Sequence, residues 1–215
     1  YTHSTGKSIT SYIIGHAICE GYVGSVDEKV DWPLMKDTVY DQQPLIDLLN
    51  MRAGDSHTID RENSHYVMGS SLHHRDMGLD TIAGLLSGTE KKGRTLFYNN
   101  FLADVLANYV AFKSGSNYDR LMKKVFQDKV KIANQVSYEK HRKTLTDGRK
   151  SRFYGSKQTL ASYSYFMTRL DFLRLAVAMM EDYQNDTCVG RYLKQIQKRA
   201  EPWYQNRSTS KNAKL

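Results

Sequence analysis

A segment near the start of the chain has the apolar spacing of a buried helix, and it constrains the fold more than any other feature. Between Ser4 and Glu20 apolar side chains recur at helical intervals, and Gly21 follows as a helix-stop signal. The recurring residues are Ile9, Ile13, Ile14, Ala17 and Ile18. The segment therefore predicts a helix that lies inside the protein.

The same reasoning predicts a mostly helical chain. Further helices are expected over 44–54, 77–86, 98–112, 117–130, 170–182 and 187–199. Thr168, with Asp171 three residues later, is typical of a capped helix start. Between 131 and 162 the helical period fades, and we expect any strands there. No repeat or low-complexity linker divides the chain, so a second independent domain is not expected.

Composition excludes several classes of protein. With 40% hydrophobic and 25% charged residues, 14 Gly and 3 Pro, the 215-residue chain is neither disordered nor collagen-like. No apolar run approaches the roughly 18 to 20 residues of a membrane span. The two cysteines, Cys19 and Cys188, are far apart and outside any C-x-x-C motif, so they indicate neither a metal site nor a redox pair.

Charge and histidine placement indicate neither nucleic acid nor metal as a partner. The net charge is +8, but positive residues are scattered over 120–157 and densest over 191–215, where a solvated chain end explains them. His73 and His74 are adjacent and point to different faces, which does not suit a metal. We expect no cofactor.

Residues 1–8, Tyr-Thr-His-Ser-Thr-Gly-Lys-Ser, fit two kinds of chemistry. Gly6-Lys7-Ser8 matches the end of a phosphate-binding loop, but Tyr1 stands where that loop needs its first glycine. Ser4-Thr-Gly-Lys7 is instead an S-x-x-K tetrad, which places an amine one helical turn from a hydroxyl. A serine becomes a nucleophile when such a neighbour eases the loss of its proton. We favour this interpretation and keep nucleotide binding as the weaker alternative.

Tyr98 is the candidate partner of this serine. The pattern Tyr-x-Asn occurs at Tyr98, Tyr183 and Tyr204, and the last two follow helix ends in charged surroundings. Tyr98 follows a glycine-containing loop and directly precedes an apolar helix, which gives it a rigid support. Tyr98 and Asn100 therefore form the second candidate motif.

These motifs resemble the serine β-lactamase and penicillin-binding-protein superfamily, and more closely its class C β-lactamase and esterase branch. Residues 48–54, Leu-Leu-Asn-Met-Arg-Ala-Gly, are similar to the family's LLTMxSG segment. Gly88-Thr89 with residues 97–100 is similar to its PGxxxxYSN stretch, although Ser87 replaces the proline. The resemblance implies an α+β fold, with 1–215 as a single partial domain, truncated at both ends. The chain would hold the nucleophile helix and the helical part, and most of the antiparallel sheet would lie outside it.

The resemblance also implies roles for the site residues. Ser4 would attack an amide or ester carbonyl and form an acyl-enzyme, and Lys7 and Tyr98 would transfer the proton. Which of these two is the general base stays open. Asn100 would hold Lys7 or the substrate by hydrogen bonds. In such a site the Ser4 Oγ should lie within about 4 Å of polar atoms of both proton-transfer residues.

One part of the family's pattern is missing. The third motif, Lys-Thr-Gly or a His- or Trp-containing equivalent, has no good match, because Lys113-Ser-Gly115 is better explained as a helix stop. Loss of one oxyanion donor costs about 10²- to 10³-fold in rate, so the chain alone is expected to be nearly inactive. A penicillin-binding or sensor domain without turnover is the alternative function. The family implies a small amide or ester substrate and a periplasmic or secreted location.

Overall fold

The apolar segment at the start of the chain forms a buried helix, as predicted. The computed structural model describes residues 2–55, 83, 86–88, 93–94, 96, 98, 100–133, 136–138 and 165–200. A 3-10 turn, η1 (His3–Thr5), leads into helix α1 (Gly6–Cys19). Ile9, Tyr12 and Ile14 on α1 are almost completely buried. The isoleucine spacing thus identified the helix and its buried face.

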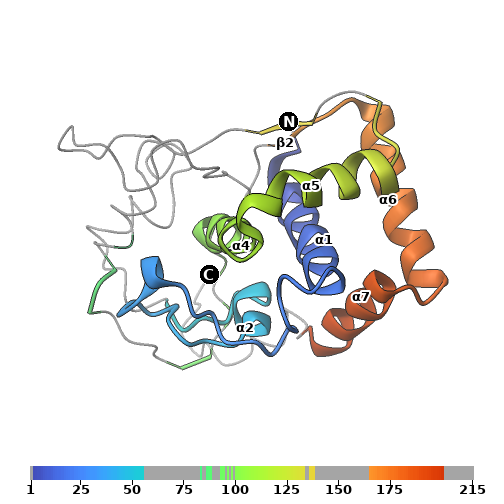
Figure 1. Cartoon of the computed structure of the whole chain (residues 1–215). Helices are drawn as coiled ribbons and strands as arrows, with labels where there is room; N and C mark the ends of the chain where they lie inside the picture. Colours follow the sequence, from blue (N-terminus) through green and yellow to red (C-terminus); the bar gives the residue numbers. More distant parts are fainter. Residues whose placement is uncertain are drawn as a thin grey trace, which may run out of the picture.

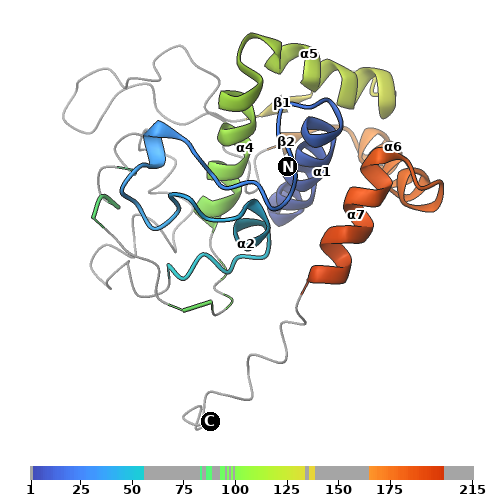
Figure 2. The same cartoon turned by 60° about the horizontal axis from the view of Figure 1, so that its bottom comes forward.

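Other helices surround α1 and cover it (Figures 1 and 2). In the views, α1 lies between α4 and α5 on one side and α6 and α7 on the other. Their bounds are α2 (Leu45–Leu49), α4 (Asn100–Ser114), α5 (Tyr118–Lys123), α6 (Arg169–Gln184) and α7 (Cys188–Arg199). Short helical turns are η2 (Pro33–Met35), η5 (Gly115–Asn117) and the π-helical η6 (Lys124–Lys129). None of the described helices combines the length and apolarity needed to cross a membrane.

Most predicted helices of the described residues are confirmed. Thr168 caps α6, where its hydroxyl accepts the Asp171 N–H at 3.1 Å. Gly115, with φ of +53°, follows the last residue of α4, so Lys113-Ser-Gly115 ends a helix as expected. The helix predicted over 77–86 lies mostly outside the described residues.

Strand structure among the described residues is short. β1 (Ser137–Tyr138) pairs antiparallel with β2 (Tyr165–Phe166), so only one of these strands falls in the predicted range of 131–162. β2 matters for the site because its Tyr165 carbonyl accepts the Thr2 N–H at 3.1 Å, next to the start of α1. The short sheet therefore places one fully buried tyrosine, Tyr165, in the core and holds the chain at the start of the central helix.

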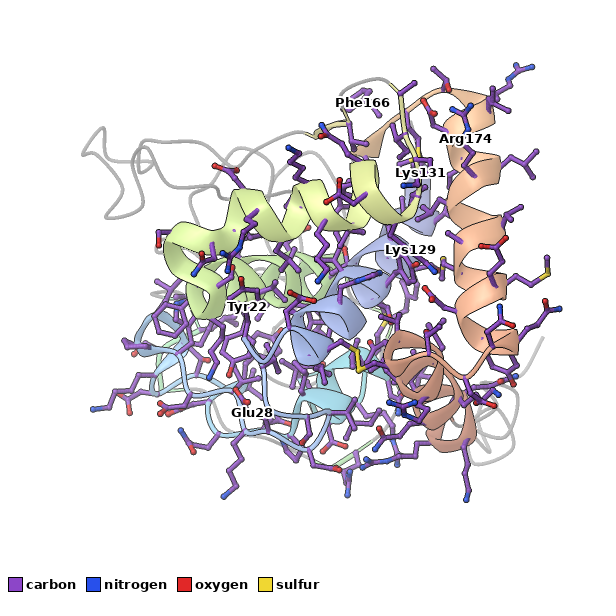
Figure 3. All side chains as sticks on the ribbon, turned by 45° about the vertical axis from the view of Figure 1, so that its right-hand side comes forward. Tyr22, Glu28, Lys129, Lys131, Phe166 and Arg174 are labelled. Atoms are coloured by element: carbon purple, nitrogen blue, oxygen red, sulfur yellow. A yellow bond between two sulfur atoms is a disulfide. The ribbon has the colours of Figure 1, made fainter. Side chains whose placement is uncertain are left out.

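The two cysteines form a disulfide, a pairing that the sequence patterns did not predict. Cys19 at the end of α1 is bonded to Cys188 at the start of α7, across 169 residues of sequence (Figure 3). Sequence spacing could not show this pairing, because it depends on how α6 and α7 fold back onto α1. The bond fixes the C-terminal end of the central helix to α7.

A buried carboxylate lies beside this disulfide. Asp182 of α6 accepts a hydrogen bond from the Tyr12 hydroxyl at 2.6 Å and one from Thr187 at 2.8 Å. Lys129 of η6 forms an ion pair with it at 2.7 Å. These hydrogen bonds and this charge lower the pKa of Asp182, although burial acts in the opposite direction. One side chain therefore joins α1, η6, α6 and α7.

The segment between α1 and α2 forms a compact loop that fixes α2 in place. The Leu45 N–H donates to the Glu28 carbonyl at 2.9 Å, and the Ile46 N–H donates to the Val26 carbonyl at 2.8 Å. The Glu28 carboxylate in turn accepts the Tyr109 hydroxyl of α4 at 2.7 Å. Because of these bonds, α2 has a fixed position relative to α4.

We predict that the disulfide contributes substantially to stability. Cys188→Ser should lower the free energy of unfolding by about 2 to 4 kcal/mol, because a bond that closes so long a loop restricts the unfolded chain. Urea unfolding of the oxidised protein measures this. Cys19→Ser should give the same loss, and the double variant should lose no more than either. A full second loss in the double variant would show that the two cysteines act separately.

We also predict a loss of stability in mild acid that depends on His16. Burial is the main cause that lowers the pKa of this α1 side chain from 6.5 to about 4. Between these values the unfolded chain binds a proton that the folded protein does not, so stability falls as pH falls, by up to about 3 kcal/mol. Urea unfolding at pH 7 and 4.5 should show the fall, and His16→Gln should reduce it. Asp182 contributes only in stronger acid, because its pKa is lowered from 3.8.

Candidate functional site

Ser4 lies in the 3-10 turn just before the central helix, and its side chain is exposed. Two backbone hydrogen bonds fix this turn. The Thr2 N–H donates to the carbonyl of buried Tyr165 at 3.1 Å, and the Thr5 N–H donates to the Thr2 carbonyl at 3.2 Å. The hydroxyl of Ser4 is therefore presented to solvent from a rigid backbone.

Lys7 occupies the first turn of α1, three residues after Ser4. Neither η1 nor the first turn of α1 contains an acidic residue. The first N–H groups of a helix carry partial positive charge, and no carboxylate of these turns offsets it. The surroundings of Ser4 thus favour negative charge on a nearby oxygen.

Tyr98 reaches this position from a distant part of the chain. Its hydroxyl donates a hydrogen bond to the Ser4 Oγ at 3.0 Å. The Lys7 Nζ lies 4.7 Å from the centroid of the Tyr98 ring. Tyr98 stands two residues before α4, which packs against α1. Three residues named from sequence patterns 94 positions apart therefore lie together.

The phenol of Tyr98 titrates differently from an isolated tyrosine. Partial burial would raise its pKa, but hydrogen bonds with Lys7 and Ser4 and the positive charge of Lys7 outweigh burial. The pKa of Tyr98 is consequently below its ordinary value. A lowered pKa makes the phenolate more available as a proton acceptor for Ser4.

The remaining candidates lie elsewhere or are not described. Asn100 is the first residue of α4, and its side chain lies outside the described residues, as do His73 and His74. Gly6-Lys7-Ser8 is part of α1 and does not form a loop. No group of three or more His, Cys, Asp or Glu in the described part of the chain is placed to hold a metal.

Sequence patterns named no residue that holds the chain on the upstream side of Tyr98. The structure shows two contacts there, both at Arg94. Its guanidinium forms an ion pair with Asp47 of α2, and its carbonyl accepts the Arg52 Nε–H at 2.9 Å. Arg52 belongs to the segment 48–54, which the family resemblance had singled out. That resemblance was the only signal in the sequence for Arg52.

A groove of about 580 Å³ opens between α1, α2, α6 and α7. Its walls are mostly apolar, and the α1 residue in it is Ser11. Ser4, Lys7 and Tyr98 do not line this groove. We place the candidate site at Ser4 because of the contacts that join Tyr98 to Ser4 and Lys7. The volume of the groove does not identify the site.

We predict that Tyr98 titrates below an ordinary tyrosine and that Lys7 is the reason. Lys7→Met should raise the Tyr98 pKa, because it removes the hydrogen bond and the charge of Lys7 and leaves only the Ser4 hydrogen bond to oppose the effect of burial. The ¹³Cζ shift of labelled tyrosine, assigned with Tyr98→Phe, measures it. Lys113→Met is the matched control, since Lys113 lies 5.9 Å from the Tyr109 ring centroid. An equal shift of Tyr98 in both variants would contradict the local explanation.

The comparisons with known proteins concern the fold. No protein-family model matches the chain, and no curated protein matches its sequence. A solved structure, the class C β-lactamase from Rhodobacter sphaeroides, superposes with a TM-score of 0.57 at 15% identity. The match covers 90% of this chain and 54% of that one, so the chain spans about half of its neighbour's length. The chain therefore has a mostly helical structure that corresponds to part of a β-lactamase fold.

Proposed function

We propose that the chain belongs to a serine hydrolase that acts on an amide or ester through an acyl-enzyme. The observation that carries this proposal is the 3.0 Å hydrogen bond between the Tyr98 hydroxyl and the Ser4 Oγ, with the Lys7 Nζ 4.7 Å from the centroid of the Tyr98 ring. A nucleophilic serine needs a base within hydrogen-bond reach and a group that tunes that base. Tyr98 and Lys7 fit these two requirements. The β-lactamase-like fold supports the proposal.

The proposed reaction has two steps. In the first, the Ser4 Oγ attacks the substrate carbonyl carbon, a C–O bond forms, and the serine proton moves to Tyr98 or Lys7. The C–N or C–O bond to the leaving group then breaks, and the leaving group takes a proton from the same pair. In the second step, water attacks the ester carbonyl and releases the acid and free Ser4.

Tyr98 is our choice for the first proton acceptor. Its hydroxyl donates to Ser4, and once Tyr98 is deprotonated the same contact lets the Ser4 hydroxyl donate to the phenolate, which Lys7 stabilises. The rate of acylation should then rise with pH until Tyr98 is deprotonated, and it should level off below the ordinary tyrosine pKa. With Lys7 as the only base, Tyr98→Phe would retain this pH profile.

We propose that this activity belongs to a protein that supplies further parts of the site. The chain spans 54% of the class C β-lactamase from Rhodobacter sphaeroides, and Tyr98 is 54% exposed. A second oxyanion donor, which the resemblance places on a strand, would add about 10²- to 10³-fold in rate. Asn100 is proposed to contact Lys7 or the substrate.

We further propose a periplasmic or secreted location. The disulfide between Cys19 and Cys188 supports it, because such bonds persist in oxidising compartments and are rare in the cytosol.

Covalent labelling tests the proposal. A fluorophosphonate should react with the Ser4 Oγ, with formation of an O–P bond and loss of fluoride, and intact-mass analysis with peptide mapping should locate it. Ser4→Ala should abolish labelling, because the nucleophile is removed. Tyr98→Phe should slow labelling by about 10²-fold or more, the contribution of a positioned base. Ser8→Ala is the matched control, since Ser8 is an exposed serine one turn further along α1.

The outcomes separate the candidate functions. Labelling at Ser8 as readily as at Ser4 would sink the hydrolase proposal. A stable β-lactam adduct on Ser4 without release of product would favour the penicillin-binding or sensor alternative. Affinity for Mg²⁺-ATP that is lost in Lys7→Ala would favour nucleotide binding.

A further inference from the structure

Tyr98 can reach Ser4 only if the chain is held on both sides of it. On the C-terminal side α4 begins at Asn100 and packs against α1. The ring is half-exposed, so packing of the side chain alone does not fix it. The upstream chain must therefore supply part of the restraint.

Arg94 restrains the chain on the upstream side of Tyr98. Its side chain forms an ion pair with the carboxylate of Asp47, and its backbone carbonyl accepts the Arg52 Nε–H at 2.9 Å. Side chain and backbone of one residue are thus held by two residues of the α2 region. Gly93, directly before Arg94, has a φ of +72°, a conformation that other residues rarely adopt.

The two holding residues are themselves fixed. The Arg52 N–H donates to the Asp47 carbonyl at 2.8 Å, so the pair acts as one unit. The Asp47 side chain is 5% exposed, whereas that of Arg94 is 57% exposed. A buried carboxylate moves little, and it fixes the position of the exposed arginine rather than the reverse. The α2 region is in turn bonded to the loop whose Glu28 contacts α4.

The short spacing between Arg94 and Tyr98 makes this restraint effective. Three residues lie between Arg94 and Tyr98, and an extended chain advances at most about 3.3 to 3.6 Å per residue. With residue 94 fixed and α4 starting two residues after Tyr98, the phenol can occupy only the volume within reach of both anchor points. That volume includes the position 3.0 Å from the Ser4 Oγ.

We propose that Asp47 and Arg52 are positioning residues that hold Arg94 and thereby place the Tyr98 hydroxyl against Ser4 and Lys7. The placement stands on geometry alone, and its consequence for catalysis rests on the proposed function. Release of residue 94 lets Tyr98 move away from Lys7, and a displacement of about 1 Å can cost 10²-fold in rate.

Two variants test the proposal. Arg52→Met removes the hydrogen bond to the Arg94 carbonyl and keeps a chain of similar length, and Arg94→Met removes the ion pair. Each should shift the ¹³Cζ titration of Tyr98 upward, toward an ordinary tyrosine, and should slow fluorophosphonate labelling of Ser4 by about tenfold or more. Circular dichroism checks the fold, and Arg52→Met keeps the test open if Arg94→Met fails to fold. Arg94→Lys, which retains the charge, should reverse part of the Tyr98 shift and recover part of the labelling rate lost in Arg94→Met.

Arg174→Met is the matched control. Arg174 is a partly exposed arginine on α6 that pairs with buried Asp171 at 2.8 Å (Figure 3). This ion pair lies within α6 and does not involve the α2 region that holds Arg94. Its loss should lower stability and leave the Tyr98 titration unchanged. The same Tyr98 shift in this control, or no shift in Arg52→Met and Arg94→Met, would overturn the positioning role.

The two proposals fail in different ways. If the Tyr98 titration shifts as expected but Ser4 is never labelled, even in the unaltered protein, then the positioning role stands and the hydrolase proposal fails. If Ser4 is labelled at the same rate in Arg52→Met, Arg94→Met and the unaltered protein, and the Tyr98 titration does not shift, then the hydrolase proposal stands and the positioning role fails.

Discussion

The rest of the structure depends on the burial of α1. Ile9, Tyr12 and Ile14 are at most 1% exposed, so the helix cannot move without loss of the core. Its N-terminal end carries Ser4 and Lys7, and its C-terminal end carries Cys19 in the disulfide. A nucleophilic hydroxyl, the role proposed for Ser4, must be held to within a fraction of an ångström, and a helix fixed in a close-packed core provides that. The residues that bury this helix and the residues of the candidate site at its N-terminal end are therefore different residues.

Local sequence patterns predicted the helices well, because helix formation depends on neighbours a few residues apart. The apolar spacing of α1, the Thr168 cap and the stop at Gly115 are all of this kind. The disulfide between Cys19 and Cys188 was missed, because it depends on the fold of residues far apart in the sequence. The π-helical turn at the end of the helix predicted over 117–130 was also missed. Long-range contacts, and not local preference, decide the pairing of the two cysteines.

The site shows the same division. Ser4 and Lys7 could be named because S-x-x-K places both on one turn. Tyr98 could be chosen among the Tyr-x-Asn sequences because it stands before an apolar helix, and the structure places its hydroxyl 3.0 Å from Ser4. Asp47 and Arg52 carry no such pattern. A buried aspartate and an arginine in a turn have many structural uses, and only the contacts with the chain upstream of Tyr98 distinguish them.

The strongest argument for a chemical role comes from a comparison among tyrosines. Burial and hydrogen bonds to carboxylates raise the pKa of Tyr12, which donates to Asp182, and of Tyr109, which donates to a glutamate. These phenols stay protonated and hold the fold together as donors. Tyr98 is directed toward Lys7 and a serine, and its pKa is lowered. A lowered pKa is what a tyrosine that takes a proton from a serine would need, so this difference supports the proposed role of Tyr98.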